Sequence, residues 1–127
     1  MSSLKEIATD KAAAAIGAYS QAISIGDLVF TSGQLPLTPE GQIAGDDVGE
    51  QTKQSMTNIK NILEAAGTGI DRVVKCTIFI TKMSDFPTVN EVYQSFLSEP
   101  FPARSTVAVA ELPKGAKVEI EAVARVE

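Results

Sequence analysis

Arg104 is the side chain with the clearest capacity for chemistry, because its neighbours restrict where it can lie. It follows Pro100-Phe101-Pro102-Ala103 and opens a predicted strand, and the two prolines stiffen the approach. A planar guanidinium matches a carboxylate through two parallel hydrogen bonds. Two interpretations stay open on these residues alone: an anchor for a carboxylate, or a solvated arginine at the end of a loop.

Glu119 is the second candidate, since it interrupts an apolar strand of sequence VEIEAVA. A carboxylate in such a strand is exposed at an edge, paired at an interface or kept for acid–base work. Glu121 lies on the same face two residues later. Strand geometry separates the two by about 6–7 Å, which is too far for a tightly shared proton. The structural and the catalytic interpretations of Glu119 both stay open on these residues alone.

Three further residues could line a pocket. Tyr19 lies in a loop of small residues, where its phenol could meet a ligand or cover the core. Ser32 and Gly33 interrupt the strand FTSGQL, and a glycine there either admits a ligand or marks a bulge. Cys76 alternates with apolar residues of another predicted strand, so we expect a buried small hydrophobe that makes a poor nucleophile.

The chain of 127 residues contains no histidine. This excludes Ser-His-Asp triads, Cys-His pairs, H-E-x-x-H zinc sites and the histidine pairs of many ribonucleases. A single cysteine allows no intramolecular disulfide and, without histidine, argues against a zinc site. The glycine-containing loops match neither a P-loop nor a dinucleotide fingerprint. We therefore predict chemistry without a metal or a cofactor.

Charge and hydropathy limit the partners. The net charge is −5 and no basic run is present, so no nucleic-acid partner is expected. No apolar run reaches the roughly 18–20 residues of a membrane span, and charges occupy the N-terminal stretch MSSLKEIATDK. The length and the 44% apolar content fit one domain over residues 1–127. We expect a cytoplasmic protein with no membrane association.

Residue patterns predict the elements that must position these side chains. Apolar residues spaced 4, 4, 3, 4 and 3 apart predict a helix over 47–66, with Asp47 at its positive end and Gly67 after its last turn. A second helix is expected to begin at a Ser84 cap and to end before Pro100. Residues 1–20 are mixed, and the alanine-rich stretch at 11–15 is predicted to be loop because it is too short to form a helix alone. Strands are predicted at 22–25, 28–35, 73–81, 104–110 and 117–126. The order β-β-α-β-α-β-β is an α+β plan.

The predicted strands divide their side chains between two faces. Two helices could cover one face, which carries Val118, Ile120, Ala122 and Ala124 of the last strand and Val74, Cys76, Ile78 and Ile80 of the middle strand. The other face is mixed, and two helices cannot cover both. A half-apolar, uncovered face predicts packing against another copy of the chain, without fixing the number of copies.

Five segments, in order, resemble the RidA/YjgF family. They are AIGAYSQA, VFTSGQLPL, LEAAG, DFPTVNEVY and a C-terminal signature made of PARSTV, LPKG and VEIEA. The resemblance extends from about Ala15 to Arg125. It implies a chorismate-mutase-like α+β fold of the bacillus type, a mixed sheet with two helices on one face. It also implies a homotrimer with a central barrel and sites in the clefts between subunits.

The activity that the resemblance implies is hydrolytic deamination of 2-iminopropanoate and 2-iminobutanoate to 2-keto acids. By matched position, Arg104 holds the substrate carboxylate and Glu119 holds or activates the attacking water. The residues implied to contact the substrate are Tyr19, Ser32, Gly33, Asn90 and Thr106, the last through its backbone. Two positions depart from the family pattern, since many members have Pro at Ala18 and Cys at Thr106. The stiffness of the Tyr19 loop and the substrate preference are therefore open.

The sequence leaves two other functions open. Some members of the family have been described as ribonucleases or translation inhibitors, although the acidic charge and the missing histidine argue against that role here. Alternatively, the same cleft could sense a small carboxylate without turnover and regulate a partner.

Overall fold

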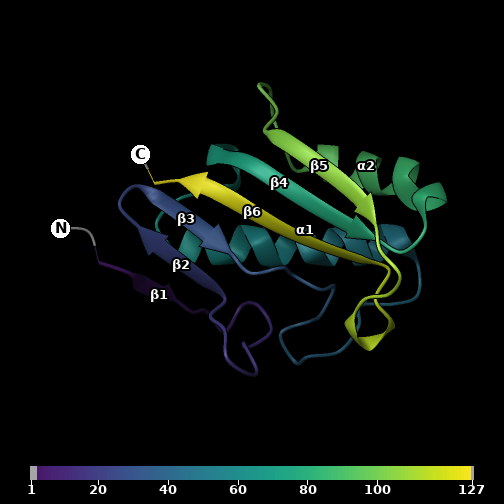
Figure 1. Cartoon of the computed structure of the whole chain (residues 1–127), viewed down its shortest axis with the longest axis horizontal. Coiled ribbons are helices and arrows are strands. Elements are labelled where there is room, and N and C mark those ends of the chain that lie inside the picture. Colours follow the sequence, from purple (N-terminus) through teal and green to yellow (C-terminus); the bar gives the residue numbers. More distant parts are fainter. Residues whose placement is uncertain (1–2, 127) are drawn as a thin grey trace.

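A mixed sheet of six strands carries two α-helices on one face across residues 3–126, the part of the chain that the computed structural model describes (Figure 1). Three short 3-10 turns connect the longer elements. The elements are β1 (Lys5–Ile7), β2 (Ala22–Ile25), β3 (Leu28–Thr31), α1 (Val48–Ala65), β4 (Val73–Ile80), α2 (Phe86–Ser95), β5 (Ala103–Ala108) and β6 (Val118–Arg125). The predicted α+β class is confirmed.

The strands lie side by side in the order β1-β2-β3-β6-β4-β5. Only β4 and β5 run parallel, and the crossover between them carries α2. The C-terminal strand β6 therefore sits in the middle of the sheet, paired with both β3 and β4. This order makes β5, the strand of Arg104, an edge of the sheet.

The helix α1 packs its apolar stripe against the sheet and contributes the largest fully buried side chains of the core. Met56, Ile59, Ile62 and Leu63 are fully buried. The helix begins at Asp47, whose carboxylate accepts a hydrogen bond from the backbone N–H of Glu50. It is followed by Gly67, whose φ of 86° is the left-handed stop expected from the sequence. The predicted range of 47–66 is correct to within one residue at each end.

Three details of the prediction are wrong. The sequence predicts no strand before residue 22, whereas Lys5–Ile7 add an edge strand to β2. Strand β3 ends at Thr31 rather than at residue 35, and Gln34 rejoins β6 through an isolated bridge to Ile120. Ser84 does not cap α2, because it lies in a 3-10 turn and the cap position falls on Asp85.

The alternation predicted for the middle strand fails at its start. Val73 is buried opposite Ala124, whereas Val74 is 43% exposed. The register against β6 shifts between Val73 and Lys75, so Val74 is an extra, bulged residue. From Cys76 onward the prediction is correct, and Cys76 is buried on the helix side.

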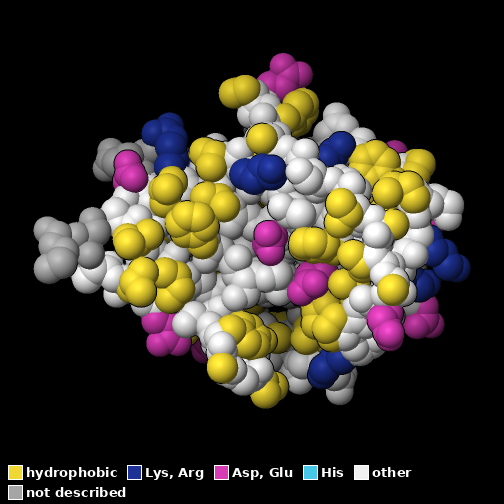
Figure 2. All heavy atoms as spheres, viewed as in Figure 1, with side chains coloured by type: hydrophobic (Ala, Val, Ile, Leu, Met, Phe, Trp, Pro, Cys, Tyr) yellow, Lys and Arg dark blue, Asp and Glu magenta, His cyan; other side chains and the backbone are white. Residues whose placement is uncertain are grey.

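The second face of the sheet is uncovered, as predicted. Figure 1 shows α1 behind the strands, and the same view in Figure 2 shows hydrophobic side chains gathered around acidic ones near the centre of the open face. Ile25, Phe30 and Val107 point to this face and are 38%, 44% and 43% exposed. None of the helices described over residues 3–126 is long and apolar enough to cross a membrane.

Candidate functional site

Arg104 lies on the helix-covered side of the edge strand β5. It is in register with the buried Cys76 of β4, so its side chain leaves the sheet on the same side. The guanidinium carbon lies 5.0 Å from the centre of the Phe86 ring and 5.3 Å from that of Tyr93. Two aromatic faces of α2 therefore hold the cation by cation–π attraction.

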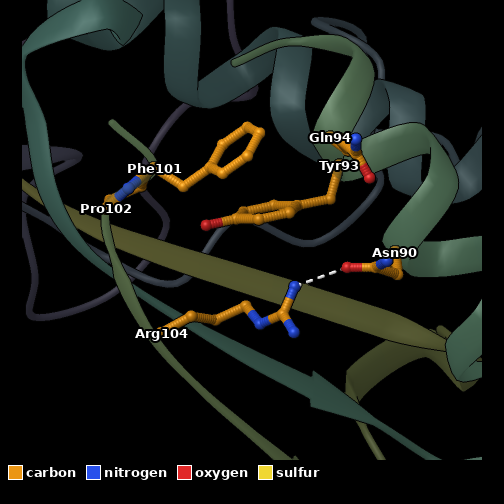
Figure 3. A pocket seen from close by; sticks show the side chains of 6 residues that line it. All are labelled: Asn90, Tyr93, Gln94, Phe101, Pro102 and Arg104. Atoms are coloured by element: carbon orange, nitrogen blue, oxygen red, sulfur yellow. Dashed lines mark hydrogen bonds between the residues drawn. The ribbon is translucent and has the colours of Figure 1, made fainter. Parts of the chain in front are cut away.

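Asn90 fixes one end of the same guanidinium. Its side-chain oxygen accepts a hydrogen bond from Nη1 of Arg104 at 2.6 Å (Figure 3). Phe86, Asn90 and Tyr93 are spaced four and three residues apart, so they lie along one stripe of α2. The Asn90 amide thus lies between two aromatic residues of this stripe and adds a hydrogen-bond acceptor for the arginine.

A cavity of about 330 Å³ opens beside Arg104. Figure 3 shows the guanidinium beneath the Tyr93 ring, with Phe101 beyond it. The lining residues are Asn90, Tyr93, Gln94, Phe101, Pro102 and Arg104. Of these, Tyr93, Gln94, Phe101 and Pro102 were not among the predicted site residues. The stripe spacing of α2 was the signal that could have found Tyr93.

Thr106 points to the same side as Arg104, two residues further along β5. Its hydroxyl oxygen is shielded from solvent and has no hydrogen-bond partner within residues 3–126. Arg104, Asn90 and Thr106, together with the cavity, make up the Arg104 half-site.

Glu119 lies on the opposite, open face of the sheet. It is opposite Phe79 of β4, and both neighbouring residues of β6 are buried on the helix side. Burial, and secondly the carboxylate of Glu121, raise the pKa of Glu119 above its usual value. Its carboxylate packs directly against the backbone of Gly33, where no side chain intervenes.

Tyr19 and Ser32 lie on the chain that leads to this carboxylate. The Ser32 hydroxyl donates to the carbonyl of Ser20 at 2.6 Å, which ties the strand end to the Tyr19 loop. Tyr19 is 53% exposed and, with Gly33, borders a hollow of about 40 Å³. Tyr19, Ser32, Gly33 and Glu119 make up the Glu119 half-site.

The two half-sites do not meet within one chain. Arg104 is level with Ala122 of β6, because both are in register with Cys76. Glu119 is three residues further along β6, and its strand is two places away from β5. Standard spacings put these positions about 10 Å apart across the sheet and about 10 Å along it, on opposite faces. No small acid can contact both groups of the same copy.

The side chains of both half-sites do not form a metal-binding cluster. Among residues 3–126, no cluster of three or more His, Cys, Asp and Glu side chains is arranged to hold a metal ion. The single thiol, Cys76, is buried, and burial raises its pKa, which disfavours the reactive thiolate.

Comparison with known proteins identifies the family. The model of the family described as Endoribonuclease L-PSP matches residues 9–126. The chain belongs to this family. A 2-iminobutanoate/2-iminopropanoate deaminase of Salmonella typhimurium is 49% identical over 123 residues, covering 94% of this chain and 96% of the relative.

Solved structures of family members superpose closely on this chain. The YjgF gene product of E. coli is 46% identical, with a TM-score of 0.91 over 97% of this chain and 99% of that one. E. coli TdcF, solved with bound serine, is also 46% identical, with a TM-score of 0.90 over 95% of this chain and 98% of that one. The resemblance to the RidA/YjgF family, expected from five sequence segments, is confirmed.

Proposed function

We propose that this chain hydrolyses reactive 2-imino acids, such as 2-iminopropanoate and 2-iminobutanoate, to 2-keto acids and ammonia. Water adds to the C=N carbon, the C–N bond then breaks, and the nitrogen leaves as ammonia. The observation that carries the proposal is the near full-length, 49% identity to a relative named as this deaminase. The TdcF structure with bound serine supports a small amino-acid-like ligand.

Arg104 is the proposed anchor for the substrate carboxylate. Its guanidinium borders a cavity large enough for an acid of four carbons, and Asn90 holds one of its nitrogens. The aromatic rings of Phe86 and Tyr93 support the cation from the helix side. A guanidinium held in this way binds a planar carboxylate through two parallel hydrogen bonds and so fixes the orientation of the imine.

Glu119 is the proposed group that holds and activates water. Its raised pKa brings it closer to neutrality than an exposed glutamate, which suits a group that takes up and returns a proton. An iminium carbon is already electrophilic, so orientation and a positioned water are sufficient. Tyr19, Ser32, Gly33 and the backbone at Thr106 complete the proposed pocket.

We further propose that the working site lies between copies of a homotrimer in the cytoplasm. The two half-sites occupy opposite faces of one sheet, so a site that uses both Arg104 and Glu119 needs two copies. The open face, with Ile25, Phe30 and Val107 partly exposed, offers apolar surface for that packing.

The activity is tested by coupling the protein to a threonine dehydratase and following keto-acid formation. The native chain is expected to accelerate release of 2-ketobutanoate, and Arg104→Ala is expected to abolish the acceleration while the chain stays folded. Arg72→Ala is the matched control, because Arg72 is exposed and lies outside both half-sites. Unchanged turnover in Arg104→Ala contradicts the assignment.

The shared site is tested by mixing two inactive variants. Chains carrying Arg104→Ala and chains carrying Glu119→Gln are unfolded together, refolded together and assayed. In a ring where each site takes Arg104 from one copy and Glu119 from the next, random mixing restores about a quarter of the native sites. Activity that stays at the level of the separate variants places both groups in one copy's site, against the proposal.

The name of the family model keeps ribonuclease activity as a second candidate. The net charge of −5 and the absence of histidine do not favour it. RNA cleavage that persists through purification and disappears in Arg104→Ala would support that candidate. Binding of a small carboxylate without turnover would instead support a non-catalytic protein that senses the carboxylate and regulates a partner.

A further inference from the structure

Gly33 makes an unusually close approach to Glu119. A Cβ atom placed on Gly33 would lie 2.5 Å from Oε2 of Glu119, 2.8 Å from its Cδ and 3.1 Å from its Cγ. Three consecutive atoms of the glutamate therefore occupy the space of the missing side chain. Any residue other than glycine at this position displaces the carboxylate.

We propose that Gly33 is a positioning residue, whose lack of a side chain lets the Glu119 carboxylate sit where it must hold water. This inference rests on the proposed deaminase function and assigns Gly33 a role different from contact with the substrate. Glycine is required at this position because there is no room for a Cβ atom, since the backbone conformation does not itself require glycine.

The backbone angles separate Gly33 from the other loop glycines. Gly17, Gly41 and Gly67 have φ values of 111°, 87° and 86°, a region that favours glycine, and nothing lies within 4 Å of their missing Cβ atoms. Gly33 is not in that region. Its need for glycine therefore comes from the contact with Glu119.

The backbone around Gly33 is held on both sides, so it cannot easily retreat from an added methyl group. Gln34 and Ile120 exchange two hydrogen bonds, at 2.7 Å and 3.1 Å. On the other side, the Ser32 N–H donates to the carbonyl of Gln21 at 2.9 Å and its hydroxyl donates to that of Ser20. The glutamate side chain is the part that must move.

The movement has to begin close to the strand. Because even Cγ of Glu119 lies within 3.1 Å, rotation of the terminal carboxylate alone does not relieve the overlap. The outer part of the side chain, with Cδ and the carboxylate oxygens, must turn away from Gly33 across the open face, where Glu121 lies on one side of it along β6. Such a swing moves the carboxylate by an ångström or more, and about 1 Å of misplacement can cost about a hundredfold in rate.

Gly33→Ala tests the inference in the coupled assay. We expect kcat to fall about ten- to a hundredfold, while the Kd for 2-ketobutanoate changes less than about twofold, because Arg104 is untouched. Gly69→Ala is the matched control. Its Cβ would lie 2.9 Å from Oδ1 of Asp71, a similar collision with a carboxylate outside both half-sites. The control is expected to keep the native kcat.

A crystal structure of the Gly33→Ala protein gives a second readout, independent of activity. A displaced Glu119 carboxylate with an unchanged backbone at residues 32–34 supports the inference. A carboxylate in its native place, or a rise in KM with kcat retained, overturns it, the latter by showing that residue 33 contacts substrate instead. Failure of the proposed function is seen separately, as a native protein that does not accelerate keto-acid release.

Discussion

Replacing Asn90 by alanine removes the one side-chain hydrogen bond that orients the Arg104 guanidinium within residues 3–126. The bond is short, at 2.6 Å, and its donor is charged. Bonds to charged groups contribute about 1.5–3 kcal/mol. Because this one is open to solvent, and the rings at 5.0 and 5.3 Å still hold the cation, we take the lower end, about 1.5 kcal/mol. That corresponds to about a tenfold loss of affinity for a carboxylate.

The assay is calorimetric titration with 2-ketobutanoate, the stable product of the proposed reaction. Asn90→Ala is expected to raise its Kd about tenfold and to leave kcat nearly unchanged, because the carboxylate is remote from the reacting carbon. Asn90→Asp should weaken binding further, since its carboxylate competes for Arg104. Gln94→Ala is the control, because Gln94 lines the same cavity without bonding to the arginine. Equal Kd values for Asn90→Ala and Gln94→Ala would refute the reasoning.

Two further predictions concern stability. Burial and Glu121 raise the pKa of Glu119 from its ordinary value of 4.5, so the folded chain binds more protons than the unfolded chain between that value and the raised one. The unfolding free energy then falls as the pH rises through this window, and Glu119→Gln should raise the Tm at pH 7 but not at pH 4. Gln21 is 4% exposed and bonds the backbone of Thr9 and Ala13, at 2.7, 3.1 and 2.8 Å. Gln21→Ala should cost about 2–3 kcal/mol in urea denaturation, and a loss below about 0.5 kcal/mol would contradict the role of this amide.

The parts of the fold that could be predicted are those with strong local patterns. The stripe of α1 repeats over five turns, and its ends carry Asp47 and Gly67, so its limits are correct to one residue. The strand Lys5–Ile7 has three residues and no such pattern, and it forms because β2 offers a free edge. The local sequence around Val74 does not predict the bulge either, since the bulge is defined by the register against β6, more than 40 residues away in the chain.

In the candidate site, local sequence likewise marks individual residues but does not predict how they are placed relative to one another. The residue types and the proline-stiffened approach mark Arg104, and a carboxylate inside an apolar strand marks Glu119. Their placement on opposite faces depends on the insertion of β6 between β3 and β4 and on the register of Cys76 with Arg104. The contact between Gly33 and Glu119 likewise joins residues 86 positions apart. Non-local pairing of this kind leaves no trace in the spacing of a single segment.

The separation of the half-sites has a consequence for the proposed chemistry. The Arg104 half-site has its cavity, its cation and its orienting amide within one copy, so it can bind a carboxylate without help. Glu119, the proposed water-holding group, faces the other side of the sheet. On that proposal it acts only on a ligand held by a neighbouring copy. On the proposed mechanism, a single chain is therefore sufficient to bind the carboxylate, whereas hydrolysis requires the assembly of copies. An open-face substitution such as Phe30→Lys, which opposes packing of copies, should then abolish keto-acid release while the Kd for 2-ketobutanoate is retained.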